Sequence, residues 1–180
     1  GQSINSLFNA LMELARLESG SEKPVWAEFD LQTTVQQVLL QTQPEALHKA
    51  LSLRSFQAHS VAGWVVCCDQ LLLHRILSNL LANALHYTPR GGVLLATRPA
   101  HGGAGVWIEV WDTGIGIAPE QQARVFDPYV QISNPQRDRS KGLGLGLAIV
   151  KHACELLGLA VTVTSTPERG TRFRVALPAS

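Results

Sequence analysis

The sequence predicts an α+β fold, a two-layer α/β sandwich with a mixed, largely antiparallel sheet, preceded by one N-terminal helix. Three observations support this fold class. The chain has 180 residues, 46% of them hydrophobic and 16% charged, which is enough apolar material for one domain with a full core. Segments with helical spacing of apolar residues alternate with short apolar runs. Turns rich in Gly or Pro separate several of these runs, which favours antiparallel hairpins.

The first 20 residues form a separate unit in this reading. The only methionine is Met12, so we expect the chain to be a fragment of a longer protein. Apolar residues spaced three or four apart form a seam that normally packs on another helix. We expect that partner to be another chain or an upstream segment, and the alternative is a helix folded back on its own domain. The seam consists of Ile4, Leu7, Leu11 and Leu14.

The remaining elements lie in residues 21–180, which we expect to form one domain. Asp30 and Asp69 each precede a helical pattern and are expected to cap a helix. Pro119 suits the first turn of a short helix, and Gly158 ends the last one. The expected helices span residues 3–19, 30–49, 70–87, 119–126 and 145–157. The expected strands span residues 25–29, 51–56, 64–68, 93–98, 106–111, 160–165 and 171–177.

Composition excludes several classes of protein. The formal charge of +1 gives no strong field to attract nucleic acid, so no nucleic-acid partner is expected. No apolar run approaches the roughly 18–20 residues that cross a bilayer, and no signal peptide opens the chain. The three cysteines fit neither a disulfide framework nor a zinc site, so we expect buried free thiols. A cytoplasmic location follows, with attachment of the parent protein to the inner membrane left open.

Two glycine clusters are candidates for binding phosphate. The first begins at Asp112, directly after a strand, and the second spans residues 142–147 at the start of a helix. Glycines before a helix let backbone amides approach phosphate oxygens, and the helix dipole favours the negative charge. Neither cluster fits a dinucleotide-binding fingerprint or a P-loop. Each cluster alone is equally compatible with a tight turn beside a packed helix.

Asn79 and Asn83 form a polar pair in an otherwise apolar helix. They are four residues apart and therefore share one helical face. Asparagine is a poor helix former, so two on one face suggest a specific role. A carboxamide oxygen can bind Mg²⁺, a hard cation that prefers oxygen ligands. The alternative is that both amides satisfy buried backbone groups.

Taken together and in this order, the motifs resemble the ATP-binding domain of sensor histidine kinases. The wider superfamily also holds DNA gyrase, the ninety-kilodalton heat-shock chaperone and MutL. The resemblance covers about residues 25–178 and implies a Bergerat-type ATP-binding fold. Residues 1–20 resemble the C-terminal end of the dimerisation and phosphoacceptor hairpin. The family's asparagine, first glycine, phenylalanine and second glycine boxes match residues 69–88, 110–117, 123–131 and 141–158.

The resemblance implies a role for each matching residue. Asp112 would accept a hydrogen bond from the adenine amino group, and Tyr87 would lie against the ring. Asn83 would bind Mg²⁺ and Asn79 would stand beside the triphosphate, which makes this pair the candidate catalytic residues. His86 stands where the family usually has a basic residue and implies a pH-sensitive phosphate contact. The rest of the expected nucleotide site is Gly114, Gly116, Ile117, Lys141, Gly142, Leu143, Gly144, Leu145, Gly146 and Thr171, with a mobile lid at about 130–141.

The implied activity is transfer of the γ-phosphoryl group of ATP, with Mg²⁺, to a histidine. None of the six histidines precedes an acidic residue and a Thr-Pro pair as the family's acceptor does, so self-labelling is not expected. The implied partners are a phosphoacceptor hairpin, a response-regulator receiver domain and a second copy in a parent homodimer. Two alternatives remain. One is an ATP-hydrolysing member of the superfamily, disfavoured because residues 69–87 lack Glu, and the other is a non-catalytic nucleotide-binding scaffold.

Overall fold

The structure, a computed structural model, describes residues 2–128 and 145–178. The helices are α1 (Gln2–Glu18), α2 (Leu31–His48), α3 (Gln70–His86), α4 (Pro119–Gln122) and α5 (Gly146–Leu157), with a 3-10 turn η1 (His59–Val61). The strands are β1 (Ala27–Asp30), β2 (Ser52–Gln57), β3 (Val65–Cys68), β4 (Gly92–Pro99), β5 (Gly105–Asp112), β6 (Ala160–Thr166) and β7 (Gly170–Pro178).

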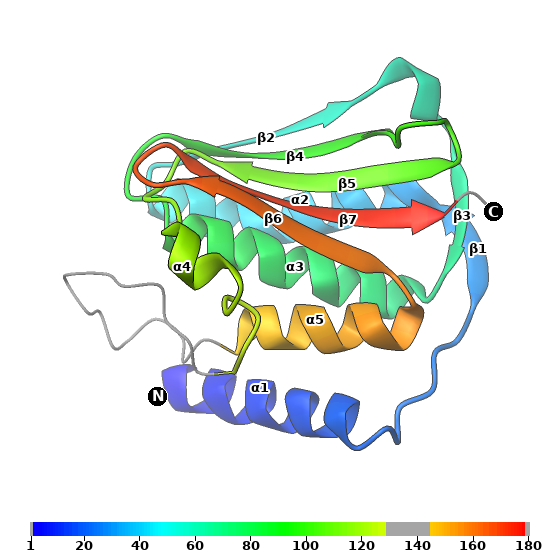
Figure 1. The fold of residues 1–180 in the computed structure, drawn as a ribbon, viewed down its shortest axis with the longest axis horizontal. Helices are drawn as coiled ribbons and strands as arrows, with labels where there is room; N and C mark the ends of the chain where they lie inside the picture. Colours follow the sequence, from blue (N-terminus) through cyan, green and yellow to red (C-terminus); the bar gives the residue numbers. More distant parts are fainter. Residues whose placement is uncertain (1, 129–144, 179–180) are drawn as a thin grey trace.

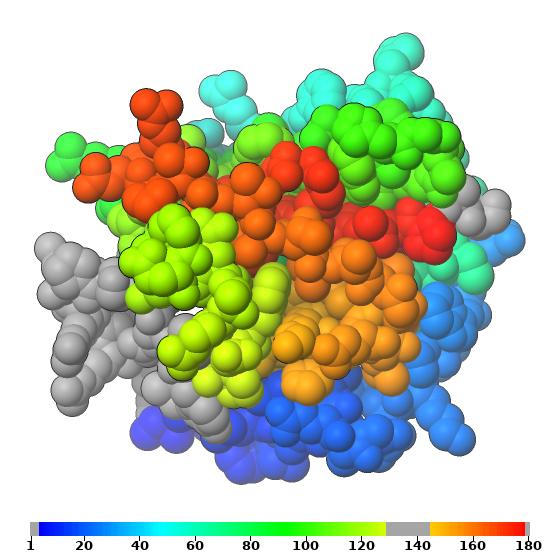
Figure 2. All heavy atoms as spheres, in the orientation of Figure 1, coloured from blue at the N-terminus to red at the C-terminus, as the bar shows by residue number. Residues whose placement is uncertain are grey.

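Two layers make up the body of the molecule. A five-stranded sheet has the order β2-β4-β5-β7-β6, and α2, α3 and α5 lie along one of its faces (Figure 1). Helix α1 forms a further layer below α5, which the space-filling view shows from the same side (Figure 2). β1 and β3 pair separately as a two-stranded antiparallel sheet. The predicted α+β sandwich with one N-terminal helix is therefore confirmed.

The helix starts are those that the sequence predicts. The Asp30 side chain accepts a hydrogen bond from the N–H of Gln32 at the start of α2. The Asp69 carboxylate accepts from the N–H of Leu72 at the start of α3 and from the N–H of Val25 at 2.8 Å. Each cap satisfies one of the backbone donors that a helix N-terminus leaves without an intrahelical partner. Asp69 thus joins the start of α3 to the segment around Val25, which precedes β1.

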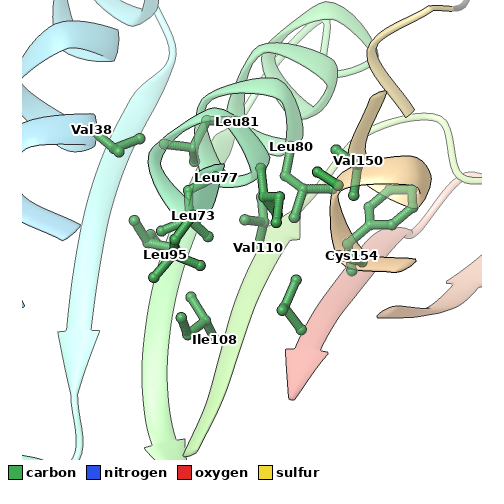
Figure 3. Packing of buried hydrophobic residues seen from close by; sticks show 14 of the residues in the cluster. Val38, Leu73, Leu77, Leu80, Leu81, Leu95, Ile108, Val110, Val150 and Cys154 are labelled. Carbon is green, nitrogen blue, oxygen red and sulfur yellow. The ribbon is translucent and has the colours of Figure 1, made fainter. Parts of the chain in front are cut away.

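The core lies between α3 and the sheet. Leu73, Leu77 and Leu80 of α3 are fully buried and lie over the strands (Figure 3). On the sheet side they meet Leu95 of β4 with Ile108 and Val110 of β5, and α5 adds Val150 and Cys154 (Figure 3). Because α3 is apolar on the face that rests on the sheet, its polar residues are left at the opposite edge and at its C-terminal end.

Several elements differ in detail from the sequence-based expectation. β2 pairs with β4 in parallel, because the chain between them crosses over through α3. The helix expected over 119–126 ends at Gln122. Beyond it the N–H groups of Arg124 and Asp127 donate three residues back, at 3.0 Å each, so the chain turns more tightly than an α-helix. Cys68 and Cys154 are buried as expected, but Cys67 is exposed because it faces away from the core on β3.

No helix within residues 2–128 and 145–178 is long and apolar enough to cross a membrane.

Candidate functional site

The loop after β5 is docked onto the C-terminal end of α3. The N–H of Ile115 donates to the carbonyl oxygen of Tyr87 at 3.1 Å. A Cβ atom at position 114 would lie 2.1 Å from the same oxygen, so only glycine allows this approach. Thr88 secures the helix end by donating its hydroxyl to the Ala84 carbonyl at 2.7 Å. The asparagine-bearing helix and the first glycine segment therefore form one unit.

The same loop is tied to the turn between β6 and β7. Gly116 has a φ of +73°, and a Cβ there would lie 2.2 Å from the carbonyl oxygen of Thr166. The N–H of Glu168 donates to the Ile115 carbonyl at 2.7 Å. Glycine is therefore required at 116 both for its backbone conformation and for the contact. These bonds place the segment from Asp112 to Ile117 between α3 and the β6–β7 turn.

Asp112 is a buried carboxylate at the centre of this arrangement. Its side chain is 8% exposed, and its Oδ1 accepts hydrogen bonds from the N–H of Gly114 at 2.9 Å and of Thr171 at 3.2 Å. Within the described part of the chain, no hydrogen bond reaches Oδ2. Burial raises the pKa of Asp112 to about 6, although the two backbone hydrogen bonds act in the opposite direction. The carboxylate is thus held in place through one oxygen, and the other can accept a donor from a ligand.

Ser165 is a site residue that the sequence analysis did not find. Thr171 pairs with Asp112 across β5 and β7, and its hydroxyl lies 2.8 Å from that of Ser165. Ser165 Oγ also accepts from the N–H of Ile117 at 2.8 Å. This serine therefore joins the end of the first glycine segment to Thr171. No sequence signal marks it, because a serine before a Pro-containing turn is ordinary turn chemistry.

The asparagine pair lies beside the start of α5. Asn79 donates its Nδ2 to the Arg75 carbonyl at 2.8 Å, and a Cβ at position 146 would lie 3.3 Å from Asn79 Oδ1. The backbone-satisfying alternative therefore holds for the amide nitrogen of Asn79, while its oxygen faces Gly146. Asn83 lies one turn further along α3 and is half-buried. The Leu145 side chain does not cap α5, and among the described residues no other side chain is recorded as a cap, so the first N–H groups of this helix are candidates for binding an anion.

Two ring side chains stand where α3 ends. The rings of His86 and Tyr87 are 4.5 Å apart with an interplanar angle of 75°, an edge-to-face contact, and both side chains are half-buried. The structure thus brings together most of the predicted site: Asn79, Asn83, His86, Tyr87, Asp112, Gly114, Gly116, Ile117, Leu145, Gly146 and Thr171. Lys141, Gly142, Leu143, Gly144 and the loop expected at 130–141 lie outside the described residues.

Comparison with known proteins identifies the family. Residues 68–180 match the family described as histidine kinase-, DNA gyrase B- and HSP90-like ATPase, which is more than half of the chain. The chain belongs to this family. The matched region of this ATPase domain begins at the last residue of β3 and includes α3, both glycine segments and Thr171.

Individual relatives are sensor kinases. The chain is 36% identical over 176 residues to the sensor-like histidine kinase SenX3 of Mycobacterium bovis, covering 98% of this chain and 42% of that protein. It is 33% identical over 184 residues to the sensor histidine kinase RppB of a Synechocystis strain, covering 99% of this chain and 38% of RppB. Among solved structures, full-length ShkA in complex with AMPPNP superposes with a TM-score of 0.83 at 32% identity, over 97% of this chain and 35% of ShkA. The chain thus spans less than half of the length of each of these relatives.

Proposed function

We propose that this chain is the ATP-binding catalytic domain of a sensor histidine kinase. In this proposal it transfers the γ-phosphoryl group of ATP to a histidine on a separate phosphoacceptor hairpin. The observation that carries the proposal is the geometry of Asp112, whose Oδ1 is saturated by two backbone donors while Oδ2 accepts none from the described residues. The family membership and the likeness to ShkA, solved with an ATP analogue, support the same assignment.

The adenine end of the site is built from the β5 loop. Asp112 Oδ2 would accept the hydrogen bond of the adenine amino group, a charge-assisted bond once the carboxylate is ionised. Gly114 and Gly116 keep the loop backbone close to α3 and to the β6–β7 turn, which holds Asp112 and Tyr87 on the same side of the molecule. Tyr87, held edge-on by His86, would lie against the ring. Ser165 positions Thr171 and Ile117 beside Asp112.

The phosphate end is built from α3 and α5. The uncapped N-terminus of α5 offers backbone donors and a favourable dipole to phosphate oxygens. Asn79 Oδ1 lies at that helix start, and Asn83 would provide an oxygen ligand for Mg²⁺. No cluster of three His, Cys, Asp or Glu occurs among residues 2–128 and 145–178. An amide oxygen, phosphates and water suit Mg²⁺, which usually keeps several waters and, when bound, neutralises charge on the phosphates.

The proposed partners follow from the same assignment. The parent kinase would be a homodimer, and the phosphoryl group would pass from the acceptor histidine to a response-regulator receiver domain. Helix α1 supports the dimer, because four of its large apolar side chains are exposed. They are Ile4, Phe8, Leu11 and Met12, at 68%, 61%, 37% and 47% exposure.

Transfer to a separately supplied hairpin tests the proposal. The chain is mixed with labelled ATP, Mg²⁺ and a phosphoacceptor hairpin from a related sensor kinase. We expect label on the hairpin and none on the chain itself, with a rate that rises with hairpin concentration because the linker no longer holds the two together. Asn83→Ala should abolish transfer, whereas Asn9→Ala, at an exposed position on α1, should leave it unchanged. Stable histidine labelling of the chain alone, or transfer that survives Asn83→Ala, would contradict the assignment.

A further inference from the structure

The five-stranded sheet has a second face, and no described helix lies against it (Figure 1). We call it the outer sheet face. On β5 the side chains alternate, so Asp112 faces the helices and Trp111 faces outward. Strand pairing sets three rows of side chains on the outer sheet face: Arg54-Leu94-Trp111-Arg172-Thr164, Phe56-Ala96-Glu109-Arg174-Thr162 and Arg98-Trp107-Ala176-Ala160.

Positive charge exceeds negative charge on this face. Glu109 is the only carboxylate in the three rows, and its side chain is 1% exposed. Its Oε1 accepts from Arg98 Nε at 2.7 Å and its Oε2 from Arg174 Nε at 2.7 Å, while Arg172 Nε lies 3.8 Å from Oε2. One carboxylate thus serves three guanidinium groups. Arg54 on β2 adds a fourth arginine to the three rows. Four arginines against one glutamate leave an excess of three positive charges on this face.

Tryptophan rings hold the arginines in place. The guanidinium carbon of Arg174 lies 3.6 Å from the ring centroid of Trp107, and that of Arg98 lies 5.0 Å from the same centroid. Arg172 lies 5.2 Å from the Trp111 ring centroid. Stacked guanidinium groups are already ordered, so less side-chain entropy is lost when they bind a carboxylate.

Arg172 is the incompletely satisfied member of the group. It donates one hydrogen bond, from Nη2 to the Thr164 hydroxyl at 3.1 Å, but its buried Nε has no hydrogen-bond partner within the described residues. Burial lowers the pKa of Arg172, and the neighbouring charge of Arg174 lowers it further. The positive charge around Arg172 therefore exceeds the single negative charge of Glu109, and a further acidic group would stabilise the Arg172 guanidinium.

We propose that the outer sheet face docks an acidic segment of a partner protein, whose Asp or Glu side chains pair with Arg54, Arg172 and Arg98. Arg and Trp dominate the energetic centres of protein interfaces, and Phe56 and Trp111 remain 53% and 39% exposed. A nucleic acid fits less well, because phosphate tracking needs a longer basic surface than these few charges and the chain as a whole carries only +1. The surface is separate from the nucleotide site, which faces the helices.

Tryptophan NMR signals provide the test. The chain has four tryptophans, and Trp26 and Trp64 lie outside the outer sheet face. A short glutamate-rich peptide is titrated into the labelled chain, with the glutamine version of the peptide as control. We expect the indole N–H signals of Trp107 and Trp111 to shift with the glutamate peptide alone, and those of Trp26 and Trp64 to stay in place. The affinity should fall as salt is raised.

Two variants isolate the charge. Arg54→Gln with Arg172→Gln leaves in place the hydrogen bonds that Glu109 accepts from Arg98, Arg174 and Trp111, and should weaken peptide binding about tenfold. Arg124→Gln removes an exposed arginine from the turn that follows α4 and should change nothing. Unshifted signals of Trp26 and Trp64 report that each variant is folded. The proposal is overturned if Trp107 and Trp111 do not respond, if the glutamine peptide binds equally, or if single-stranded oligothymidylate binds more tightly than the glutamate peptide.

Discussion

Two carboxylates on β5 show how environment sets the behaviour of a side chain. Asp112 and Glu109 are both buried, and burial raises the pKa of each. For Glu109 the hydrogen bonds and charges of Arg98 and Arg174 outweigh burial, so its pKa is lowered. Asp112 has only backbone donors, and its pKa remains raised, at about 6. Glu109 is therefore part of the scaffold. Asp112 is suited to accept a hydrogen bond from a ligand.

Replacing Asp112 should therefore stabilise the protein. Because the folded-state pKa lies above the usual 3.8, the favourable contribution of this group is present below pH 3.8 and lost as pH rises through about 6. Asp112→Asn removes a buried charge and keeps an oxygen for both backbone donors, so at pH 7 the free energy of unfolding should rise by up to about 3 kcal/mol. Denaturant unfolding measures this change. The exposed Asp127→Asn is the control, and a less stable Asp112→Asn protein would refute the burial argument.

Gly116 of the first cluster and Gly103 of the β4–β5 loop separate two effects that the sequence cannot distinguish. Gly116 and Gly103 have nearly the same φ, +73° and +71°, but a Cβ at 103 meets nothing within 4 Å. Gly103→Ala should cost about 1 kcal/mol of stability from the backbone conformation alone. Gly116→Ala adds the collision with Thr166, so it should cost clearly more and weaken nucleotide binding as well. Equal unfolding free energies for the two variants would show that the contact is unimportant.

At the residue scale, sequence reasoning reaches the residues that belong to a motif. Asp112, Gly114 and Gly116 were predicted because, in order with the other motifs, they lie in a segment that resembles the first glycine box of sensor histidine kinases. Ser165 was missed, and so was the Arg-Trp-Glu cluster around Glu109. These side chains come together only through strand register, which the order of residues along the chain does not reveal.

At the scale of the element, α1 has two apolar stripes where the sequence analysis saw one seam. Leu14 and Leu17 are buried against the domain, and the salt bridge of Glu13 to Arg75 of α3 also links the helix to it. Ile4, Phe8, Leu11 and Met12 form the second, exposed stripe. One face of this helix therefore packs on its own domain, which was the alternative considered, and the contact with another chain stays a prediction for the exposed face.

The two stripes predict different phenotypes. Leu14→Ala with Leu17→Ala empties buried positions and should lower the free energy of unfolding by at least about 2 kcal/mol. Ile4→Ala with Phe8→Ala changes only exposed positions, so it should leave stability unchanged and weaken self-association. Chemical denaturation and sedimentation of both pairs check this, and each pair serves as the control for the other. Loss of self-association only in the Leu14 and Leu17 pair would contradict the dimer surface.

The other elements show which parts of a fold can be read along the chain. Helix caps at Asp30 and Asp69 and the hairpin of β6 and β7 are local, and they were predicted to within a residue or two. The parallel pairing of β2 with β4 and the separate sheet of β1 and β3 depend on contacts between distant segments. Local pattern carries no information on such pairings, so they emerged only from the structure.

At the scale of the whole molecule, the sheet separates two surfaces with different chemistry. Asp112, the first glycine segment, Gly146 and the asparagine pair lie on the side of the helices, and they belong to the nucleotide site proposed above. The outer sheet face carries the arginine cluster. β5 contributes to both, because successive residues of a strand point to opposite faces. A partner on the outer sheet face would therefore contact the same strand that ends in Asp112.

The central claim is that Asp112 anchors the adenine of ATP, and calorimetric titration with a non-hydrolysable ATP analogue and Mg²⁺ tests it most directly. The wild-type chain should bind, and its affinity should fall as pH is lowered through about 6, because protonation removes the charged acceptor. Asp112→Asn should bind about 10-fold or more weakly at pH 7, since a hydrogen bond to a charged group contributes about 1.5–3 kcal/mol, and its affinity should no longer follow pH over this range. An Asp112→Asn protein that binds the analogue as tightly as wild type would contradict the account.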